Sequence, residues 1–303
     1  MKKIIILMLL VSIVFVSGCI VGSSKQIQPQ KETGQGLEIT DFSSSVSDVY
    51  SGKLVSIQMM VENKGDYEIN KNYGLVYLIT GSDWILTQDA NKSYTKSLKP
   101  SDPVSGAPSG SAIFRWSAKA PILPASQKRI DTFIARAYYD YQTKSFGNVW
   151  LYPEVEATAA RDKKEALPSS EFSCTKAPIS LDVSVVPDPV IVAESGELFS
   201  LVIDIKNNGN GVVYKNGTIT PYNYELTEND LNKISLQIEL PNDITITDPS
   251  CYQDVELIGG EANIICDLEV TNMPTTKKTI PITVKADYGY YTDKTLNIKI
   301  LGK

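Results

Sequence analysis

The chain has 303 residues, a net charge of −6 and no histidine. Its 35 acidic residues outnumber 29 basic ones and no basic run is present, which argues against nucleic acid as a partner because phosphate contacts need clustered Lys and Arg. The lack of histidine excludes Ser-His-Asp and Cys-His catalysis, histidine-ligated zinc and histidine-based pH switching. We predict no metal site and no cofactor.

Residues 1–18 have the pattern of a secretory signal. Lys2 and Lys3 precede an apolar run at 4–16, and small residues then lead to Cys19. A helix that crosses a bilayer needs about 20 apolar residues, so this run is too short to span. The ending resembles a lipoprotein cleavage box, which implies that a membrane lipid alkylates the thiol of Cys19. Ordinary signal cleavage, with Cys19 an incidental thiol, is the alternative.

The next residues predict a tether and a first β-rich domain. Residues 19–36 are rich in Ser, Lys, Gln, Gly and Thr and predict a flexible tether. The first domain is predicted at 37–157. Its clearest strand, at 54–63, alternates apolar and polar residues with period two. Further strands are expected at 75–80, 112–118, 132–141 and 146–155, and Pro-rich loops at 99–110 and 120–126.

A polar segment then leads to a second domain. Residues 158–178 predict a linker with one helical turn at 162–167, and the second domain is predicted at 179–303. It repeats the first: the strand at 198–207 ends in Asn207-Asn208-Gly209, as the strand at 54–63 ends in Asn63-Lys64-Gly65. The tyrosine-rich stretch 137–143 also recurs at 286–292. Other strands are expected at 234–240, 280–288 and 296–300.

These short alternating strands predict an all-β protein with two tandem immunoglobulin-like antiparallel β-sandwich domains. In each repeat a Ser-Gly pair precedes a strand, an Asn-x-Gly motif follows it, and a late strand pair contains Ala-x-Tyr-x-Tyr-x-Thr; the Ser-Gly pairs are Ser51-Gly52 and Ser195-Gly196. This pattern resembles the CARDB-type and related immunoglobulin-like modules of archaeal cell-surface proteins. The resemblance covers both domains. It implies a fold and a cell-surface setting, and it brings no catalytic residues.

Four cysteines are present, and three remain if Cys19 carries lipid. Cys251 and Cys266 flank a strand, a Gly259-Gly260 turn and a second strand, so a bridge across this hairpin is predicted. Cys174 is then left as a thiol. Because spacing does not fix connectivity, a bridge from Cys174 to either of the other two stays open.

Two other groups of residues are candidate sites. Asn91 and Asn216 match the N-glycosylation pattern Asn-x-Ser/Thr. Tyrosines in the two repeated stretches could stack on sugar rings, or they could be half-buried core residues that recur because the fold recurs. The tyrosines considered for stacking are Tyr139, Tyr141, Tyr288 and Tyr290.

The sequence therefore predicts a non-catalytic protein, lipid-anchored on the extracytoplasmic face of the cell membrane. We expect it to act as an envelope spacer, adhesion or assembly module whose partners are the membrane, through the anchor, and other envelope proteins or glycans. The first alternative is a binding subunit that holds a glycan or peptide at the inter-domain junction or at the loop 99–126. The second is a carboxylate-based hydrolase, which needs two acids that converge in a concave site.

Overall fold

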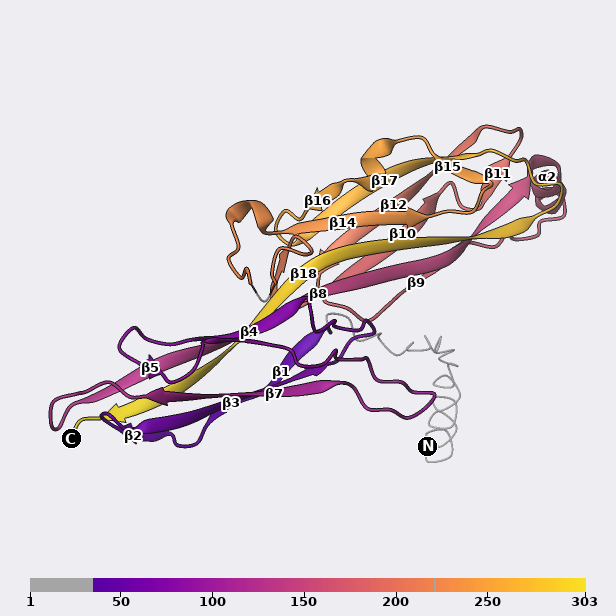
Figure 1. Cartoon of the computed structure of the whole chain (residues 1–303). Helices are drawn as coiled ribbons and strands as arrows, with labels where there is room; N and C mark the ends of the chain where they lie inside the picture. Colours follow the sequence, from indigo (N-terminus) through magenta and orange to yellow (C-terminus); the bar gives the residue numbers. More distant parts are fainter. Residues whose placement is uncertain (1–34, 221) are drawn as a thin grey trace, which may run out of the picture. The chain divides into compact units, whose positions relative to one another are not determined.

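The computed structural model describes residues 35–220 and 222–303 and shows an all-β protein (Figure 1). The predicted signal, Cys19 and nearly all of the predicted tether lie outside these residues, so the structure does not test them. Within the described residues, no helix has the length and apolar character needed to cross a membrane.

Two four-stranded antiparallel sheets have the same strand order, one in each sequence repeat. The first runs β1 (Leu37–Ser44), β3 (Leu54–Asn63), β7 (Ser111–Lys119) and β5 (Ile85–Leu86). The second runs β10 (Ile179–Val186), β12 (Glu197–Asn207), β17 (Glu261–Val270) and β15 (Ile244–Ile246). The alternation predicted for 54–63 and 198–207 is confirmed, because β3 and β12 bury their apolar side chains on one face.

A ten-stranded sheet completes both sandwiches. Its main path is β16 (Asp254–Glu256), β14 (Lys233–Glu239), β18 (Lys278–Leu301), β8 (Lys128–Pro153), β4 (Gly74–Ile79) and β6 (Asn91–Ser93). Four short strands pair with β8 or β18 beside this path: β2 (Asp48–Tyr50), β9 (Glu171–Cys174), β11 (Val190–Val192) and β13 (Val212–Tyr214).

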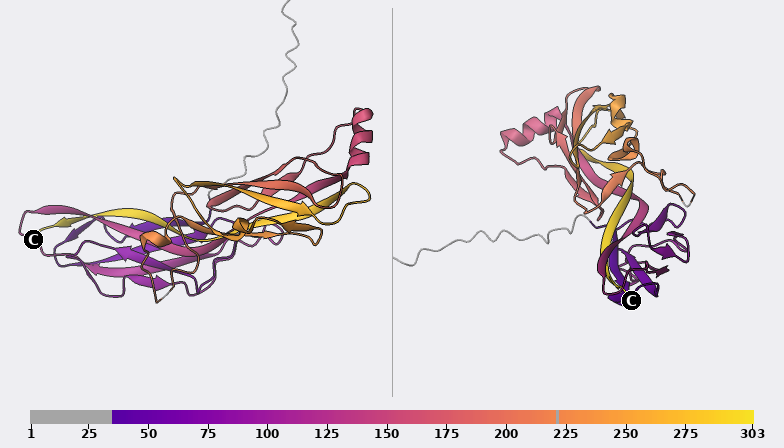
Figure 2. Two further views of the ribbon diagram at one scale, coloured as in Figure 1. Left: turned by 90° about the horizontal axis from the view of Figure 1, so that it is seen from above. Right: turned by 90° about the vertical axis from the view of Figure 1, so that its left-hand side faces the viewer.

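Two long strands differ from the prediction. Residues 132–141 and 146–155 were each expected to be a strand, but they belong to one strand, β8, and the strands expected at 280–288 and 296–300 are both parts of β18. The residues that join them in β8, Gln142-Thr143-Lys144-Ser145, include no Gly or Pro to break the strand. β8 and β18 pair antiparallel over all 24 residues of β18 and stay side by side in every view (Figures 1 and 2).

Each sandwich contains strands from both repeats. β2 of the first repeat pairs with the end of β18, and β11 of the second repeat pairs in the same parallel manner with the end of β8. The pairing is centred on Asp140 and Gly289, which are directly opposite each other and occupy matching positions in the two repeats. Each sequence repeat is therefore one continuous stretch of the chain, whereas each sandwich contains strands from both repeats. The bounds 37–157 and 179–303 stay a prediction for independent domains.

The segment predicted as a linker contains regular structure. Helix α2 (Glu154–Asp162) starts directly after β8, so it lies earlier and is longer than the turn predicted at 162–167. Glu154 and Glu156 in its first turn and Arg161 in its last turn favour it through the helix dipole. Strand β9 then pairs with β8 at 145–148. Two short 3-10 helices, η2 (Glu228–Asp230) and η3 (Pro249–Tyr252), lie in the second repeat.

Candidate functional site

The repeated tyrosines meet at the middle of the β8–β18 pair. Tyr139 is opposite Tyr290 and Tyr141 is opposite Tyr288, and their ring centroids are 5.8 Å and 6.3 Å apart. Along each strand the two rings also touch, at 5.7 Å in β8 and 6.4 Å in β18. These four residues, the tyrosine quartet, lie on one face because side chains alternate along a strand. They form the core where the chain passes from one sandwich to the other.

Two hydroxyls of the quartet hold the Asn-x-Gly turns that end β3 and β12. The Tyr141 hydroxyl accepts a hydrogen bond from the backbone N–H of Tyr67 at 3.1 Å. The Tyr290 hydroxyl accepts one from Gly211 at 2.8 Å and donates to the Asn207 carboxamide at 3.0 Å. Each turn is thus hydrogen-bonded to a tyrosine of its own repeat, and the two tyrosines occupy matching positions.

The other two hydroxyls hold the first strands of the repeats. The backbone of Leu37, at the start of β1, hydrogen-bonds the Tyr139 hydroxyl. The backbone N–H of Ile179, at the start of β10, donates to the Tyr288 hydroxyl, which also bonds Thr143 at 2.8 Å. Burial raises the pKa of both phenols, so they are neutral hydrogen-bonding groups at physiological pH.

The burial of the quartet argues against the ligand-stacking interpretation. All four rings are at most 2% exposed, so none has a face open to a sugar. The other interpretation, that the clusters recur because the fold recurs, accounts for them. A cleft of about 270 Å³ near Gly36, Pro178 and Asn210 touches only the rims of Tyr139 and Tyr290.

The opposite face of the same crossing carries a carboxylate cleft. Asp140 and Asp287 line a cleft of about 350 Å³ with Tyr67, Glu68, Asn70, Tyr73, Tyr141, Asn216 and Gly217. One Asp140 oxygen accepts the backbone N–H of Gly217 at 3.1 Å, and the other is buried without a partner. Asp287 accepts a hydrogen bond from Gln142 at 2.7 Å.

Asp140 has a strongly raised pKa. Its pKa is about 7, because burial and, to a smaller extent, the charge of Asp287 raise it by more than the Gly217 hydrogen bond lowers it. Because Asp140 is opposite Gly289, Asp287 is its diagonal cross-strand neighbour. The Cα atoms of such neighbours are roughly 7 to 8 Å apart. Carboxylate-based hydrolysis uses two acids in one cleft, and the raised pKa of Asp140 suits the general-acid role. Sequence reasoning could not find this pair, because Asp140 and Asp287 lie far apart along the chain.

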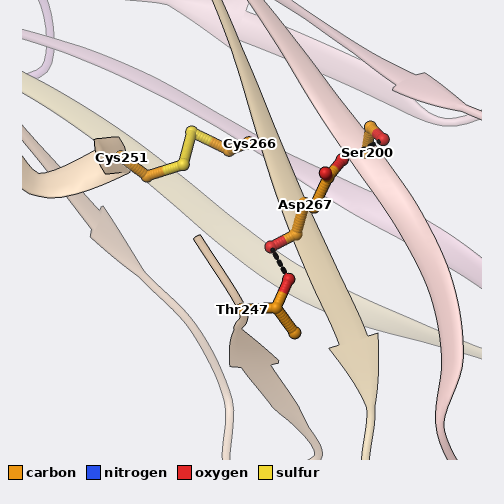
Figure 3. The surroundings of a disulfide bond; sticks show 5 residues. All are labelled: Ser200, Thr247, Cys251, Cys266 and Asp267. Atoms are coloured by element: carbon orange, nitrogen blue, oxygen red, sulfur yellow. Dashed lines mark hydrogen bonds between the residues drawn. A yellow bond between two sulfur atoms is a disulfide. The ribbon is translucent and has the colours of Figure 1, made fainter. Parts of the chain in front are cut away.

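The predicted disulfide is confirmed, but the hairpin that it was expected to cross is not formed. Cys251 and Cys266 are bridged, with their Cα atoms 5.6 Å apart (Figure 3). The predicted turn exists at Gly259 and Gly260, both at positive φ, yet its two arms join different sheets: β16 pairs with β14, and β17 pairs with β12. The bridge therefore links η3 to β17.

Strand β17, which contains Cys266, is hydrogen-bonded to a strand on each side next to the bridge (Figure 3). Asp267 accepts Ser200 through its carboxylate at 2.7 Å and Thr247 through its carbonyl oxygen at 3.0 Å. Cys174 is outside the bridge, and its thiol donates to the Thr175 carbonyl oxygen at 3.4 Å.

The two candidate glycosylation residues differ in exposure. Asn216 is exposed and precedes Gly217, which has a φ of +76°. Asn91 is half-buried in β6. Both stay predictions. The segment 99–126, predicted as one ligand loop, contains strand β7, and Phe114 and Trp116 in that strand are buried. Residues 101–108 are exposed, and a short bridge between Asp102 and Ala107 shapes the tip of this part.

A groove beside β7 has one wall inside the predicted ligand segment 99–126, but its other wall was not predicted. It has a volume of about 720 Å³ and lies between Ser111–Arg115 of β7 and residues in and around β6. The second wall contains Gln88, Lys92, Ser93, Thr95 and Lys96. Only the pairing of the strands brings these two stretches together. The described residues contain no group of three or more Cys, Asp or Glu able to hold a metal ion.

No family model matches the sequence, and no curated protein matches it. Among solved structures, the native conformation of E. coli alpha-2-macroglobulin aligns with 89% of this chain at 11% identity and a TM-score of 0.23, and the chain spans 17% of that protein. The secreted serine protease VesC of Vibrio cholerae aligns with 85% of this chain and 50% of its own at 8% identity and a TM-score of 0.19. The Enterococcus faecalis MSCRAMM ACE aligns with 89% and 98% at 7% identity and 0.18. Likenesses this low do not inform the function.

Proposed function

We propose that this protein is a non-catalytic envelope module, anchored through Cys19 on the extracytoplasmic face of the membrane, that acts as a stiff spacer for adhesion or assembly. The signal-like start and the resemblance to CARDB-type surface modules support the setting. The observation that carries the spacer role is the uninterrupted pairing of β8 with β18 through both sandwiches.

Strand exchange opposes a hinge. Two domains on a flexible linker can reorient without breaking hydrogen bonds, since few contacts cross the boundary. Here any bend at the crossing would break ladder bonds near Asp140 and Gly289 and would expose the buried tyrosine quartet. Exposing large aromatic side chains costs about 2 kcal/mol or more each, so bent states are rare.

Spin-label distances test this proposal. In a Cys174→Ser background, nitroxides at Lys119→Cys in β7 and Asp182→Cys in β10 report on the two four-stranded sheets, because both positions are exposed. The matched control is Asp182→Cys with Glu256→Cys, both in the second repeat. We expect an equally narrow distance distribution for both pairs. A broad or two-peaked distribution for the first pair alone would contradict the spacer role.

The carboxylate hydrolase is the second candidate, because Asp140 and Asp287 meet its requirement for two acids in one cleft. Chromogenic glycosides test it. Turnover that falls at least a hundredfold in Asp140→Asn, with a rate that declines above pH 7 as the Asp140 proton is lost, would support catalysis. Equal rates for the variant and the wild-type protein would rule out catalysis by Asp140.

A further inference from the structure

One edge of β7 is open. β7 pairs with β3 along its whole length, but with β5 only at Ala118 and Lys119. The last hydrogen bond on that side runs from the Thr87 N–H to the Ser117 carbonyl oxygen at 3.0 Å. Backbone groups alternate in direction along an antiparallel strand. The backbone N–H and C=O groups therefore point away from β3 at three residues, Ser111, Ile113 and Arg115. On that side no described backbone group pairs with them.

The groove beside this edge has room for another strand. Its volume of about 720 Å³ is twice that of the Asp140 cleft. Phe114 and Ala112 supply an apolar wall, and the Phe114 ring is braced by Tyr94 at a centroid distance of 5.6 Å. Strands lie about 4.8 Å apart, so an added strand would fill the groove along β7.

The groove is basic in an acidic protein. Lys92, Lys96 and Arg115 line it, and none of its lining residues is acidic. Lys92 donates to Gln88 and lies 5.8 Å from the Trp116 ring, and Arg115 donates to Gln58 at 3.0 Å. All of these contacts are with neutral groups. Lys92 and Lys96 line the side of the groove near β6, whereas Arg115 lies on the outer face of β7 and is turned toward Gln58 of β3. Among the described residues no carboxylate pairs with any of the three, and this charge favours an anionic occupant.

We propose that the open edge of β7 binds an extended acidic segment of a partner protein by strand addition. Main-chain hydrogen bonds to Ser111, Ile113 and Arg115 would hold the segment, and its inward side chains, apolar, would face Phe114. Its outward side chains, acidic, would lie on the same face as Arg115, and Lys92 and Lys96 would add positive charge from the side of β6. This inference names the partner chemistry for the assembly role proposed above and rests on that role.

Other occupants fit the groove less well. Two copies of this edge would bring two sets of the same cations together, which is how edge strands avoid self-pairing. The segment 19–36 of this chain contains Lys25 and Lys31 against a single acid, Glu32, so it lacks the complementary charge.

The matching strand of the second repeat does not offer the same site. Cys266 takes the position of Trp116, because each is opposite the matching residue of β12 or β3. It carries the bridge to η3 at this edge. Glu261, Asn263 and Ile265 stand where the first repeat has Ser111, Ile113 and Arg115, so none of these three positions carries a cation, and Glu261 adds a negative charge.

The test uses fluorescein-labelled seven-residue peptides of alternating Asp and Val, or alternating Lys and Val, with the mature chain in detergent. Fluorescence anisotropy should show at least tenfold tighter binding of the Asp peptide, and added salt should weaken it. Ile113→Pro removes one edge N–H and leaves the bonds to β3, so this variant should fold and bind at least tenfold more weakly. Asn263→Pro makes the same change in β17 and should bind as the wild-type protein does.

Each outcome of these binding measurements either supports or overturns strand addition at β7. Loss of binding in Ile113→Pro and in the pair Lys92→Gln and Lys96→Gln, with Asn263→Pro unchanged, supports strand addition at β7. No binding of the Asp peptide, or equal binding by Ile113→Pro, overturns it, and so does self-association that Ile113→Pro abolishes. Failure of strand addition would not change the spin-label distances, nor the lipid adduct expected on Cys19 by intact mass spectrometry, so it can be distinguished from failure of the envelope-module role.

Discussion

The tyrosine hydroxyls are the smallest features on which the two repeats depend. Tyr141 and Tyr290 each accept a backbone N–H from the turn that follows β3 or β12. A Cβ atom at Gly65 or Gly209 would lie 2.1 Å or 2.3 Å from the respective hydroxyl, so the turns need glycine there because the tyrosine approaches so closely. The Asn-x-Gly motif and the late tyrosine thus form one structural unit that is repeated.

Removing either hydroxyl should destabilise the protein. In Tyr141→Phe or Tyr290→Phe a partly buried backbone N–H loses its acceptor, which costs about 1 kcal/mol. Urea denaturation measures the free energy of unfolding. Tyr222→Phe is the matched control, because Tyr222 is 96% exposed and should change stability by less than about 0.5 kcal/mol. Equal stability of all three variants would mean that the turns do not depend on these bonds.

Asp140 should make stability depend on pH. Its pKa is about 7 in the folded protein and about 3.9 in an unfolded chain, so between these values the folded state holds a proton that the unfolded state has lost. Stability therefore falls as pH rises from about 4 to 7 and is then constant for this group, with a total change of about 4 kcal/mol.

Asp140→Asn should remove most of this fall. The amide oxygen can still accept the Gly217 N–H, and no charge is buried. Thermal unfolding at pH 4, 6 and 8 should show the largest gain over the wild-type protein at pH 8 and little change at pH 4. Asp89→Asn, at an exposed carboxyl, should follow the wild-type curve. A gain that is the same at all three pH values would point to packing rather than to the carboxyl proton.

At the scale of elements, alternation predicted the strands that have one buried face. β3 and β12 each bury one face of a four-stranded sheet, so period two marked them clearly. The sequence also predicted the bridged cysteines and the glycine turn between them. It did not show that the arms of this turn separate into two sheets, because alternation identifies a strand but not its partner.

The long strands could not be predicted for a related reason. The sequences of 132–141 and 146–155 alternate in the same way whether they form two strands or one, and only pairing with β18 makes them continuous. Only one wall of the groove beside β7 lies in the predicted ligand segment 99–126, and the other wall could not be predicted for the same reason. Lys92, Lys96 and Arg115 are scattered basic residues in the sequence, and the pairing of β4 with β6 and of β3 with β7 brings them together.

At the scale of the whole molecule, the two repeats act as an exchanged pair within one chain. Each long strand leaves its own sandwich at the tyrosine quartet and completes the other, so neither sandwich has a full set of strands without both repeats. A basic strand edge occurs in the first repeat and a disulfide at the matching place in the second. The repeats thus share a framework and differ where we expect partners to bind.

The last prediction concerns the anchor on which the envelope role depends. In membranes of the native host, intact mass of the mature chain should begin at Cys19 and include a lipid adduct, and the protein should partition into detergent. Cys19→Ser should lack the adduct and be retained with an uncleaved signal or be released, because the thiol is the alkylated group in the cleavage box that this sequence resembles. Cys174→Ser is the matched control, since it removes a thiol within the described fold and should leave mass and partitioning otherwise unchanged. A lipid-free mature chain would make this a diffusible protein, whose strand edge then meets partners in solution.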